Sequence, residues 1–327
     1  MSTLNWTVVA AATDPARDGW ADAAIIADVA APRFVTWDEV VAEKASFQSG
    51  ETVLFERMSG WDMPNPVAGQ RARYREFATA LAQLGAAVDD GGATLAAAVA
   101  PTLLTVDRAE RDVFLRANGV PVLEGSDLDE AGRNILRPRF AATDDWIVDG
   151  WQKTLFLHRA RDGFHVRRSP AEAVHGVREL KRITELLAAD GIYAVANLHR
   201  AHLHNDYHDI RFALIDGEVT HAAGVVCGRT VHRPWYGGRR RELDAFLTRF
   251  GAARWEKLVL LAERTATLFP GVRSLGVDLC LDNAAAEYVF DVDPFGADLP
   301  GALGMKNTVG DGVPVRAAVL RALSAAS

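Results

Sequence analysis

The chain has 327 residues, of which 49% are hydrophobic and 24% are charged, and its formal net charge of -7 argues against a protein that binds nucleic acid over a broad surface. This length and composition provide a large buried core and favour two or three domains. No apolar run reaches the roughly 20 residues that cross a bilayer, and the first residues lack the pattern of a secretory signal, so we expect a cytoplasmic protein without a membrane partner.

The first hundred residues are expected to form a small βα domain with a mostly parallel sheet. Thr36 followed by Glu39 matches a capping box, which marks the start of a helix. The apolar runs typical of strands are residues 6–13, 23–29 and 52–57. The segments with apolar residues at helical spacing are residues 36–47 and 72–86.

A second unit begins near Thr105 with an amphipathic helix that ends at Asn118 and Gly119. The longest helix is expected at residues 171–191, and further helices at 239–251 and 252–269. The strand candidates that surround them are residues 135–140, 144–148, 154–160, 192–198, 209–226, 275–281 and 288–295. We therefore expect two α+β halves, residues 101–190 and 191–327, with a ligand groove between them.

Three aspartates near the C-terminus carry the strongest chemical signal. Asp291 and Asp293 must point to the same face of one strand, because side chains alternate along a strand, and Asp278 on the neighbouring strand can join them. Three adjacent carboxylates repel one another unless a cation neutralises them, and hard oxygen ligands suit Mg²⁺. The alternative is an acidic, solvated loop after an edge strand.

The segment FPGVRSLGVDLCL together with YVFDVDPFGADLPG resembles the C-terminal signature of ATP-grasp enzymes. It is preceded by DIRFALIDGEV and VHRPWYGGRRREL, in the order found in the glutathione synthetase and ribosomal-protein glutamate ligase branch. The Pro-Phe-Gly form is most similar to a bacterial subgroup of the superfamily. The resemblance covers roughly residues 100 to 301, and it implies a small N-terminal domain at 1–100 followed by the two halves of an ATP-grasp fold.

The resemblance assigns roles to residues of the strand that begins at Asp209. Arg211 matches the arginine that reaches the reacting phosphate or acyl phosphate, and a planar charged fork suits that task. Asp209 would orient this arginine or bind the nucleotide. The alternative is an exposed ion pair on a strand. The spacing of the nearby histidines does not match a zinc-binding pattern, so a polar loop over the nucleotide is favoured over a transition-metal site. These histidines are His199, His202, His204 and His208.

Other positions depart from the family pattern. Arg108 and Arg137 stand where lysines usually bind the phosphates of ATP, which keeps the charge but changes its geometry. The loop at 139–146, RFAATDDW, lacks the glycines that usually let backbone amides approach phosphates. Asp291 and Asp293 replace the customary glutamate and asparagine, so the implied magnesium site is more anionic.

The hinge between the two halves should present its backbone to adenine and an acid to the ribose. No acid is present there, so Asn197 would have to serve. The implied adenine-binding residues are Val195, Ala196, Asn197 and Leu198. Arg239, at an expected helix start after Gly237 and Gly238, could bind an anionic substrate or simply be solvated. Arg229 resembles a second arginine of the family with a shifted position.

These observations favour an ATP-dependent carboxylate-amine ligase that acts through an acyl phosphate on small molecules, with ATP and Mg²⁺ as cofactors. The alternatives are an ATP-grasp kinase, a catalytically degenerate nucleotide-binding module, and, on the histidine cluster, a metal-dependent hydrolase. The expected partners are a small carboxylate and an amine, and a homodimer is left open. The sequence names neither substrate.

Overall fold

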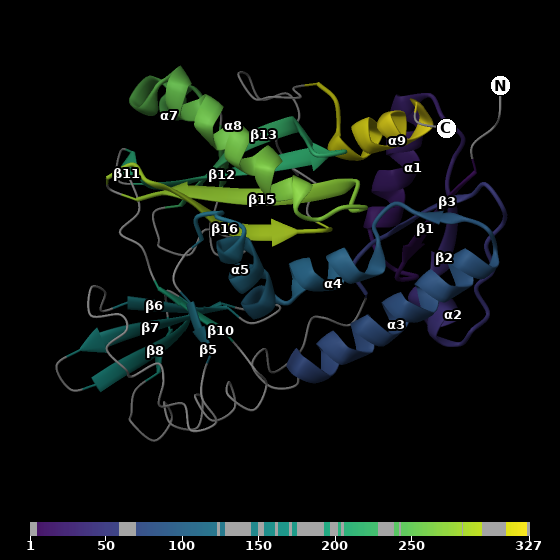
Figure 1. Cartoon of the computed structure of the whole chain (residues 1–327), viewed down its shortest axis with the longest axis horizontal. Helices are drawn as coiled ribbons and strands as arrows, with labels where there is room; N and C mark the ends of the chain where they lie inside the picture. The colour runs from purple at the N-terminus through teal and green to yellow at the C-terminus, as the bar shows by residue number, and fades with distance from the viewer. Residues whose placement is uncertain are drawn as a thin grey trace.

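The computed structural model describes three sheets and the helices that cover them (Figure 1). The described residues are 5–58, 70–122, 125–127, 145–149, 154–160, 163–169, 172–174, 193–196, 202–203, 206–227, 239–241, 243–282, 284–295 and 312–325. Among these residues no helix is long and apolar enough to cross a membrane.

The N-terminal unit is built on a parallel sheet of four strands in the order β2-β1-β3-β4. Its strands are β1 (Trp6–Ala10), β2 (Arg33–Thr36), β3 (Thr52–Phe55) and β4 (Thr94–Leu95), and its helices are α1 (Ala16–Ala27), α2 (Trp37–Val41) and α3 (Gln70–Asp90). The predicted capping box is confirmed, because the Thr36 side chain accepts a hydrogen bond from the amide of Glu39 and the Glu39 side chain accepts one from the amide of Thr36. The predicted βα layer is therefore present.

The strand predicted at residues 23–29 is wrong, because most of this segment belongs to α1. Trp20, Ala23, Ala24 and Ala27 are buried at the three- and four-residue spacing of a helix face. The consecutive isoleucines that suggested a strand are exposed, Ile25 by 79%. Alanine favours the helix, and only the alanine face contacts the core.

A six-stranded antiparallel sheet forms a second layer, in the order β5-β10-β6-β7-β8-β9. Its strands are β5 (Gly125–Asp127), β6 (Asp145–Asp149), β7 (Thr154–Ala160), β8 (Gly163–Ser169), β9 (Glu172–Val174) and β10 (Tyr193–Ala196). The predicted helix at 171–191 is wrong at its start, because β9 pairs with β8 there. The rest of that segment lies outside the described residues.

The third sheet runs β14-β13-β12-β15-β16, with β11 paired to β12. Its strands are β11 (His202–Leu203), β12 (Asp206–Ile215), β13 (Glu218–Cys227), β14 (Arg239–Arg241), β15 (Ser274–Leu281) and β16 (Glu287–Asp293). The predicted turn at Asp216 and Gly217 connects β12 and β13, and both residues have positive φ angles. The predicted helix at 239–251 is wrong at its start, because Arg239 lies in β14 and pairs with β13.

Two helices pack on one face of this third sheet (Figure 1). They are α7 (Asp244–Phe250) and α8 (Ala252–Thr267), and their core includes Phe212, Val277 and Phe269. Helices α4 (Val99–Val106) and α5 (Arg108–Ala117) connect the N-terminal sheet to this core. Asp107 caps α5 by accepting a hydrogen bond from the amide of Glu110.

The other face of the third sheet is divided. One part, formed by Ala213, Ile215 and Ala223, packs in a core shared with β1, α1 and the last helix, α9 (Val315–Ala325). Helix α9 therefore lies against α1 of the N-terminal unit although the chain reaches it last (Figure 1). The limits 1–100, 101–190 and 191–327 for the three units stay a prediction. The second part of this face carries the polar residues described next.

Candidate functional site

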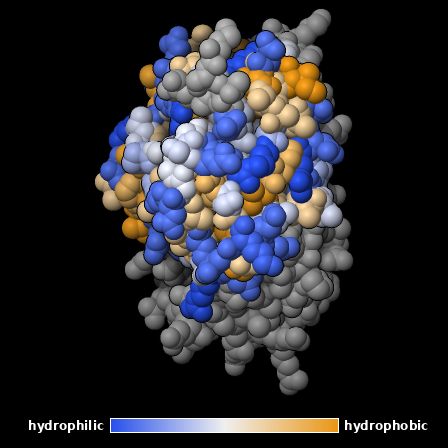
Figure 2. All heavy atoms as spheres, turned by 90° about the vertical axis from the view of Figure 1, so that its right-hand side faces the viewer, coloured by the Kyte–Doolittle hydropathy of each residue, from blue (hydrophilic) through white to orange (hydrophobic). Residues whose placement is uncertain are grey.

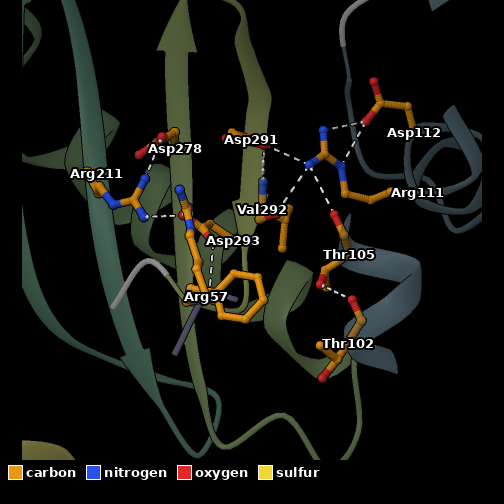
Figure 3. A network of polar contacts seen from close by, with 11 residues as sticks. Arg57, Thr102, Thr105, Arg111, Asp112, Arg211, Asp278, Asp291, Val292 and Asp293 are labelled. Atoms are coloured by element: carbon orange, nitrogen blue, oxygen red, sulfur yellow. Dashed lines mark hydrogen bonds and ion pairs between the residues drawn. The ribbon is translucent and has the colours of Figure 1, made fainter. Parts of the chain in front are cut away.

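The three predicted aspartates lie on one face of the third sheet, beside Arg211. Arg211 of β12 is the direct neighbour of Asp278 on β15, and Asp278 is the direct neighbour of Asp291 on β16. Directly paired residues of an antiparallel sheet share a face, so the prediction that Asp278 and Asp291 share a face is confirmed (Figure 3). Asp293 continues the same face opposite Gly276.

A β-bulge determines which side chains of β16 reach this face. The register shifts between Asp278 and Leu279, so that Asp278 pairs with Asp291 whereas Leu279 pairs with Val289, and Phe290 is the extra residue. Val289 is buried with the helices on the apolar face. Without the bulge, Asp291 would follow Val289 into that core, because residues two apart share a face.

Arg211 bridges two of the aspartates. Its Nη1 donates to Asp278 Oδ2 at 2.9 Å and its Nη2 donates to Asp293 Oδ2 at 3.2 Å. Burial alone lowers the pKa of Arg211, but the charges of Asp278, Asp293 and Asp291 more than offset it and raise the pKa above its ordinary value. The arginine therefore stays charged, with its two terminal nitrogens in fixed directions.

A second arginine reaches the same carboxylate from the N-terminal unit. Arg57 follows β3, and its Nη2 donates to Asp293 Oδ2 at 2.5 Å (Figure 3). The Asp293 side chain also accepts a hydrogen bond from the amide of Phe295 through Oδ1, at 3.0 Å. Phe295 packs into the core of the N-terminal sheet against Phe55 and Phe77. The end of β16 is therefore fixed to the N-terminal unit beside the charged cluster.

A third arginine, Arg111 of α5, holds Asp291. Its side chain is 3% exposed, and its Nη1 donates to Asp291 Oδ1 at 2.7 Å. Its Nη2 and Nε donate to Asp112 Oδ1 at 3.0 and 3.1 Å, and its Nη1 also donates to the backbone carbonyl oxygens of Val292 and Thr105. Burial lowers the pKa of Arg111, but the charges of Asp112 and Asp291 raise it by more, so the pKa lies above its ordinary value. This buried pair connects α5 to the acidic strand.

Asp209 lies on the same face of β12 as Arg211, two residues earlier, and it is 4% exposed. Its direct neighbours across the sheet are Val225 and Cys280, and not one of the three aspartates. Arg211 donates to Asp278, its own direct neighbour on β15, and to Asp293. The proposal that Asp209 orients Arg211 or binds the nucleotide stays a prediction.

The aspartates do not form a ready-made metal-binding cluster in this arrangement. Among the described residues, no group of three histidine, cysteine or acidic side chains is placed to hold one ion. Asp278, Asp291 and Asp293 each contact a guanidinium instead. Their chemistry still fits a divalent cation, because they supply hard oxygen donors from adjacent strands, and Asp278 and Asp291 keep 19% and 23% of their side-chain surface exposed.

Three solved structures share this architecture. The ATP-grasp ligase PsnB, in complex with a phosphomimetic variant of its minimal precursor, Mg and ADP, superimposes with a TM-score of 0.58 at 15% identity and 98% coverage of both chains. The D-cycloserine synthetase DcsG gives a TM-score of 0.61 at 15% identity, with 97% of this chain and 99% of that chain covered. The macrocyclase MdnC from Microcystis aeruginosa MRC, bound with the precursor peptide MdnA, gives 0.58 at 11% identity, with 99% and 100% covered.

The chain has the ATP-grasp fold. The resemblance seen in the sequence is confirmed at this level, and the branch within the superfamily stays a prediction. A scan against models of protein families gives no match, and a search of curated proteins gives none either.

For the remaining predicted ATP-binding and substrate-binding residues, the structure gives the helix or strand in which the residue lies, or the residue lies outside the described part of the chain. Arg108 is the first residue of α5, as expected, and Val195 and Ala196 lie in β10, which pairs with β5 and β6. Arg239 lies in β14, so its expected place at a helix N-terminus is wrong. The predictions that lie outside the described residues are those for Arg137, Asn197, Leu198, Arg229, His199 and His204.

Arg57 and Arg111 belong to the charged cluster of this ATP-grasp fold but were not predicted from the sequence. Arg57 stands two residues after the end of β3, near the carboxyl ends of a parallel sheet, where ligands commonly bind, and this position is the local signal that marks it. Arg111 stands in an ordinary amphipathic helix and carries no such signal. Both are separated from their aspartates by most of the chain, 236 and 180 residues.

Proposed function

We propose that this chain is an ATP-dependent ligase that joins a carboxylate to an amine through an acyl-phosphate intermediate. The observation that carries the proposal is Arg211, held by Asp278 and Asp293 on the acidic face of an ATP-grasp fold. A permanently charged fork, oriented before the substrate arrives, suits an oxygen-rich group whose negative charge redistributes during the reaction.

The chain's own residues would bind, orient and neutralise. Asp278, Asp291 and Asp293 would hold Mg²⁺, which supplies charge neutralisation on the phosphate oxygens when bound. Arg211 would bind the acyl phosphate until an amine attacks. Arg111 keeps Asp291 in place through its hydrogen bond of 2.7 Å. Such chemistry depends on positioning and electrostatics rather than on a general acid and base, which agrees with the composition of the cluster.

The solved neighbours support a ligase in general. PsnB and MdnC are seen in complex with precursor peptides, and DcsG is a D-cycloserine synthetase. For this chain the proposed substrates are a small carboxylate and a small amine. A peptide carboxylate is the second possible substrate, and the test described next covers both.

The proposal is tested by trapping the intermediate. The purified chain is incubated with ATP, Mg²⁺ and hydroxylamine over a panel of carboxylates labelled with ¹⁸O. An acyl phosphate converts to a hydroxamate and transfers one labelled oxygen to the released phosphate, whatever the natural amine is. The control variant is Arg273→Ala, whose ion pair with Asp216 lies at an exposed hairpin and should leave the yield unchanged.

The other outcomes of this test identify the alternatives. A stable phosphorylated product without hydroxamate or label transfer would indicate an ATP-grasp kinase. Binding of ATP without any turnover over the panel would indicate a nucleotide-binding module. Either result would overturn the ligase proposal.

A further inference from the structure

Asp293 Oδ2 accepts hydrogen bonds from two guanidiniums that come from different parts of the chain. Arg57 approaches from the end of β3 at 2.5 Å, and Arg211 approaches along the sheet at 3.2 Å (Figure 3). The other oxygen, Oδ1, accepts from the amide of Phe295. A divalent cation that binds Asp293 through Oδ2 must therefore replace a guanidinium.

We propose that the Arg57 guanidinium occupies the place beside Asp293 Oδ2 that a divalent cation would take, and that binding of the cation displaces this guanidinium. This inference rests on the proposed function, because it needs the acidic face to bind a metal-nucleotide complex. It adds a residue of the N-terminal unit that the family signature does not include.

Exposure distinguishes Arg57 from the two other arginines. Its side chain is 48% exposed, whereas those of Arg211 and Arg111 are 12% and 3% exposed. Exposed ion pairs contribute little to stability, whereas breaking a buried pair is costly. Arg111 and Arg211 each keep a second carboxylate, Asp112 and Asp278 respectively, whereas Arg57 contacts Asp293 alone among the described carboxylates. Arg57 is therefore the guanidinium that a cation replaces most easily.

Arg57 also has a second partner beside Asp293. Its guanidinium lies over the Phe295 ring at 5.5 Å from the centroid, a cation-π contact made in addition to the ion pair. Phe295 itself stays packed against Phe55 and Phe77 in the N-terminal core. Cation binding would thus remove the ion pair between the N-terminal unit and β16 while the apolar contact between them persists.

The test compares metal-loaded and metal-free nucleotide on the full chain. Binding of the Mn²⁺ complex of ADP, and of ADP alone in excess EDTA, is measured by calorimetry for the wild type and for Arg57→Met, which keeps an apolar stem over Phe295. We expect Arg57→Met to bind the Mn²⁺ complex about 1.5- to 5-fold more tightly, the fold-change of one exposed ion pair. Affinity for metal-free ADP should not change.

Two comparisons separate this inference from the proposed function. Asp293→Asn should weaken binding of the Mn²⁺ complex, and Arg273→Ala should leave every affinity unchanged. If the wild type binds neither form of ADP, both this inference and the proposed function fail. If it binds the Mn²⁺ complex in an Asp293-dependent way, but Arg57→Met binds that complex equally or more weakly, only this inference is overturned.

A second readout follows the displaced guanidinium directly. Phenylglyoxal modifies exposed arginines, and mass spectrometry gives the rate at Arg57. We expect the Mn²⁺ complex of ADP to raise this rate in the wild type, and to leave it unchanged in Asp293→Asn, where the ion pair is already absent. Equal rates at Arg57 with and without the complex in the wild type would contradict displacement.

Discussion

Arg211 and Asp278 are direct neighbours on β12 and β15, and their side chains form an ion pair of 2.9 Å on the face of the sheet opposite α8. This pair links the two strands that carry separate parts of the sequence signature, the DIR segment of β12 and the VDL segment of β15. Because the register of the sheet fixes both residues, the direction of the guanidinium is set by the fold before any ligand binds.

Replacing Arg211 should reduce catalysis far more than nucleotide binding. We expect Arg211→Ala to lower the rate of hydroxamate formation by about 10²- to 10³-fold, the cost of removing one preorganised group that stabilises developing charge. Arg211→Lys should recover only a small part of the rate, because an ammonium cannot contact Asp278 and Asp293 as a fork. Retention of the full rate in Arg211→Ala would remove this residue from the mechanism.

Replacing Arg111 should destabilise the protein. Arg111→Leu leaves Asp112 buried without its guanidinium and releases Asp291, so we expect the free energy of unfolding to fall by about 3 to 5 kcal/mol. Urea denaturation followed by circular dichroism measures the change. The matched control is Arg273→Ala at the exposed hairpin pair, for which a loss of about 1 kcal/mol or less is expected. Equal losses in the two variants would show that the buried contacts of Arg111 add nothing.

Replacing Gly217 tests the hairpin between β12 and β13. Gly217 has a φ angle of +87°, and a Cβ atom built there meets no other atom within 4 Å, so the cost of a side chain is conformational alone. We expect Gly217→Ala to lower the free energy of unfolding by about 1 to 2 kcal/mol. Gly217→Asn should cost less, since asparagine tolerates this backbone region. Thermal unfolding of the two variants side by side provides the comparison.

His221 should make stability depend on pH. It is 6% exposed on β13, and its Nε2 contacts the carbonyl oxygen of Val313 at 2.8 Å. Burial lowers its pKa below the ordinary value of 6.5, although that carbonyl opposes the shift. The unfolded chain therefore binds the proton more readily, so this contribution to stability is complete above pH 6.5 and is lost as the pH falls towards the folded pKa.

The slope of this dependence is at most about 1.4 kcal/mol per pH unit for a single group. Urea denaturation between the folded pKa and neutral pH measures it in the wild type and in His221→Gln, which keeps a polar contact with Val313 but cannot titrate. We expect the slope in this range to be smaller in the variant. Parallel pH profiles would show that other groups account for it.

Much of the fold follows from local sequence signals. The Thr36 and Glu39 box and the Asp216 and Gly217 turn act over a few residues, so a reader of the sequence can find them. The segment at 23–29 misled because its exposed isoleucines do not report the alanine face that contacts the core. The helix start predicted at Arg239 is wrong because the pairing of this segment with β13 is a long-range contact that no local sequence signal indicates.

The candidate site likewise has a part that the sequence predicts and a part that it does not. Side-chain alternation along β16 was enough to predict that Asp291, Asp293 and Asp278 share a face, although the bulge at Phe290 that makes this compatible with a buried Val289 was not foreseen. The partners Arg57 and Arg111 were missed because they come from a different unit and a different helix. Contacts of this kind exist only after the units dock.

The position of α9 has a consequence for biosynthesis. Ala317 and Leu320 complete a core that contains Trp6 and Val8 of the first strand, so the two ends of the chain stabilise one another. During translation, β1 and α1 emerge long before α9, so the side of α1 that packs against α9 stays exposed to water until α9 has been synthesised. Separate expression of the first hundred residues would reproduce this incomplete state permanently, and supplying a peptide of residues 312–325 in trans is the direct way to relieve it.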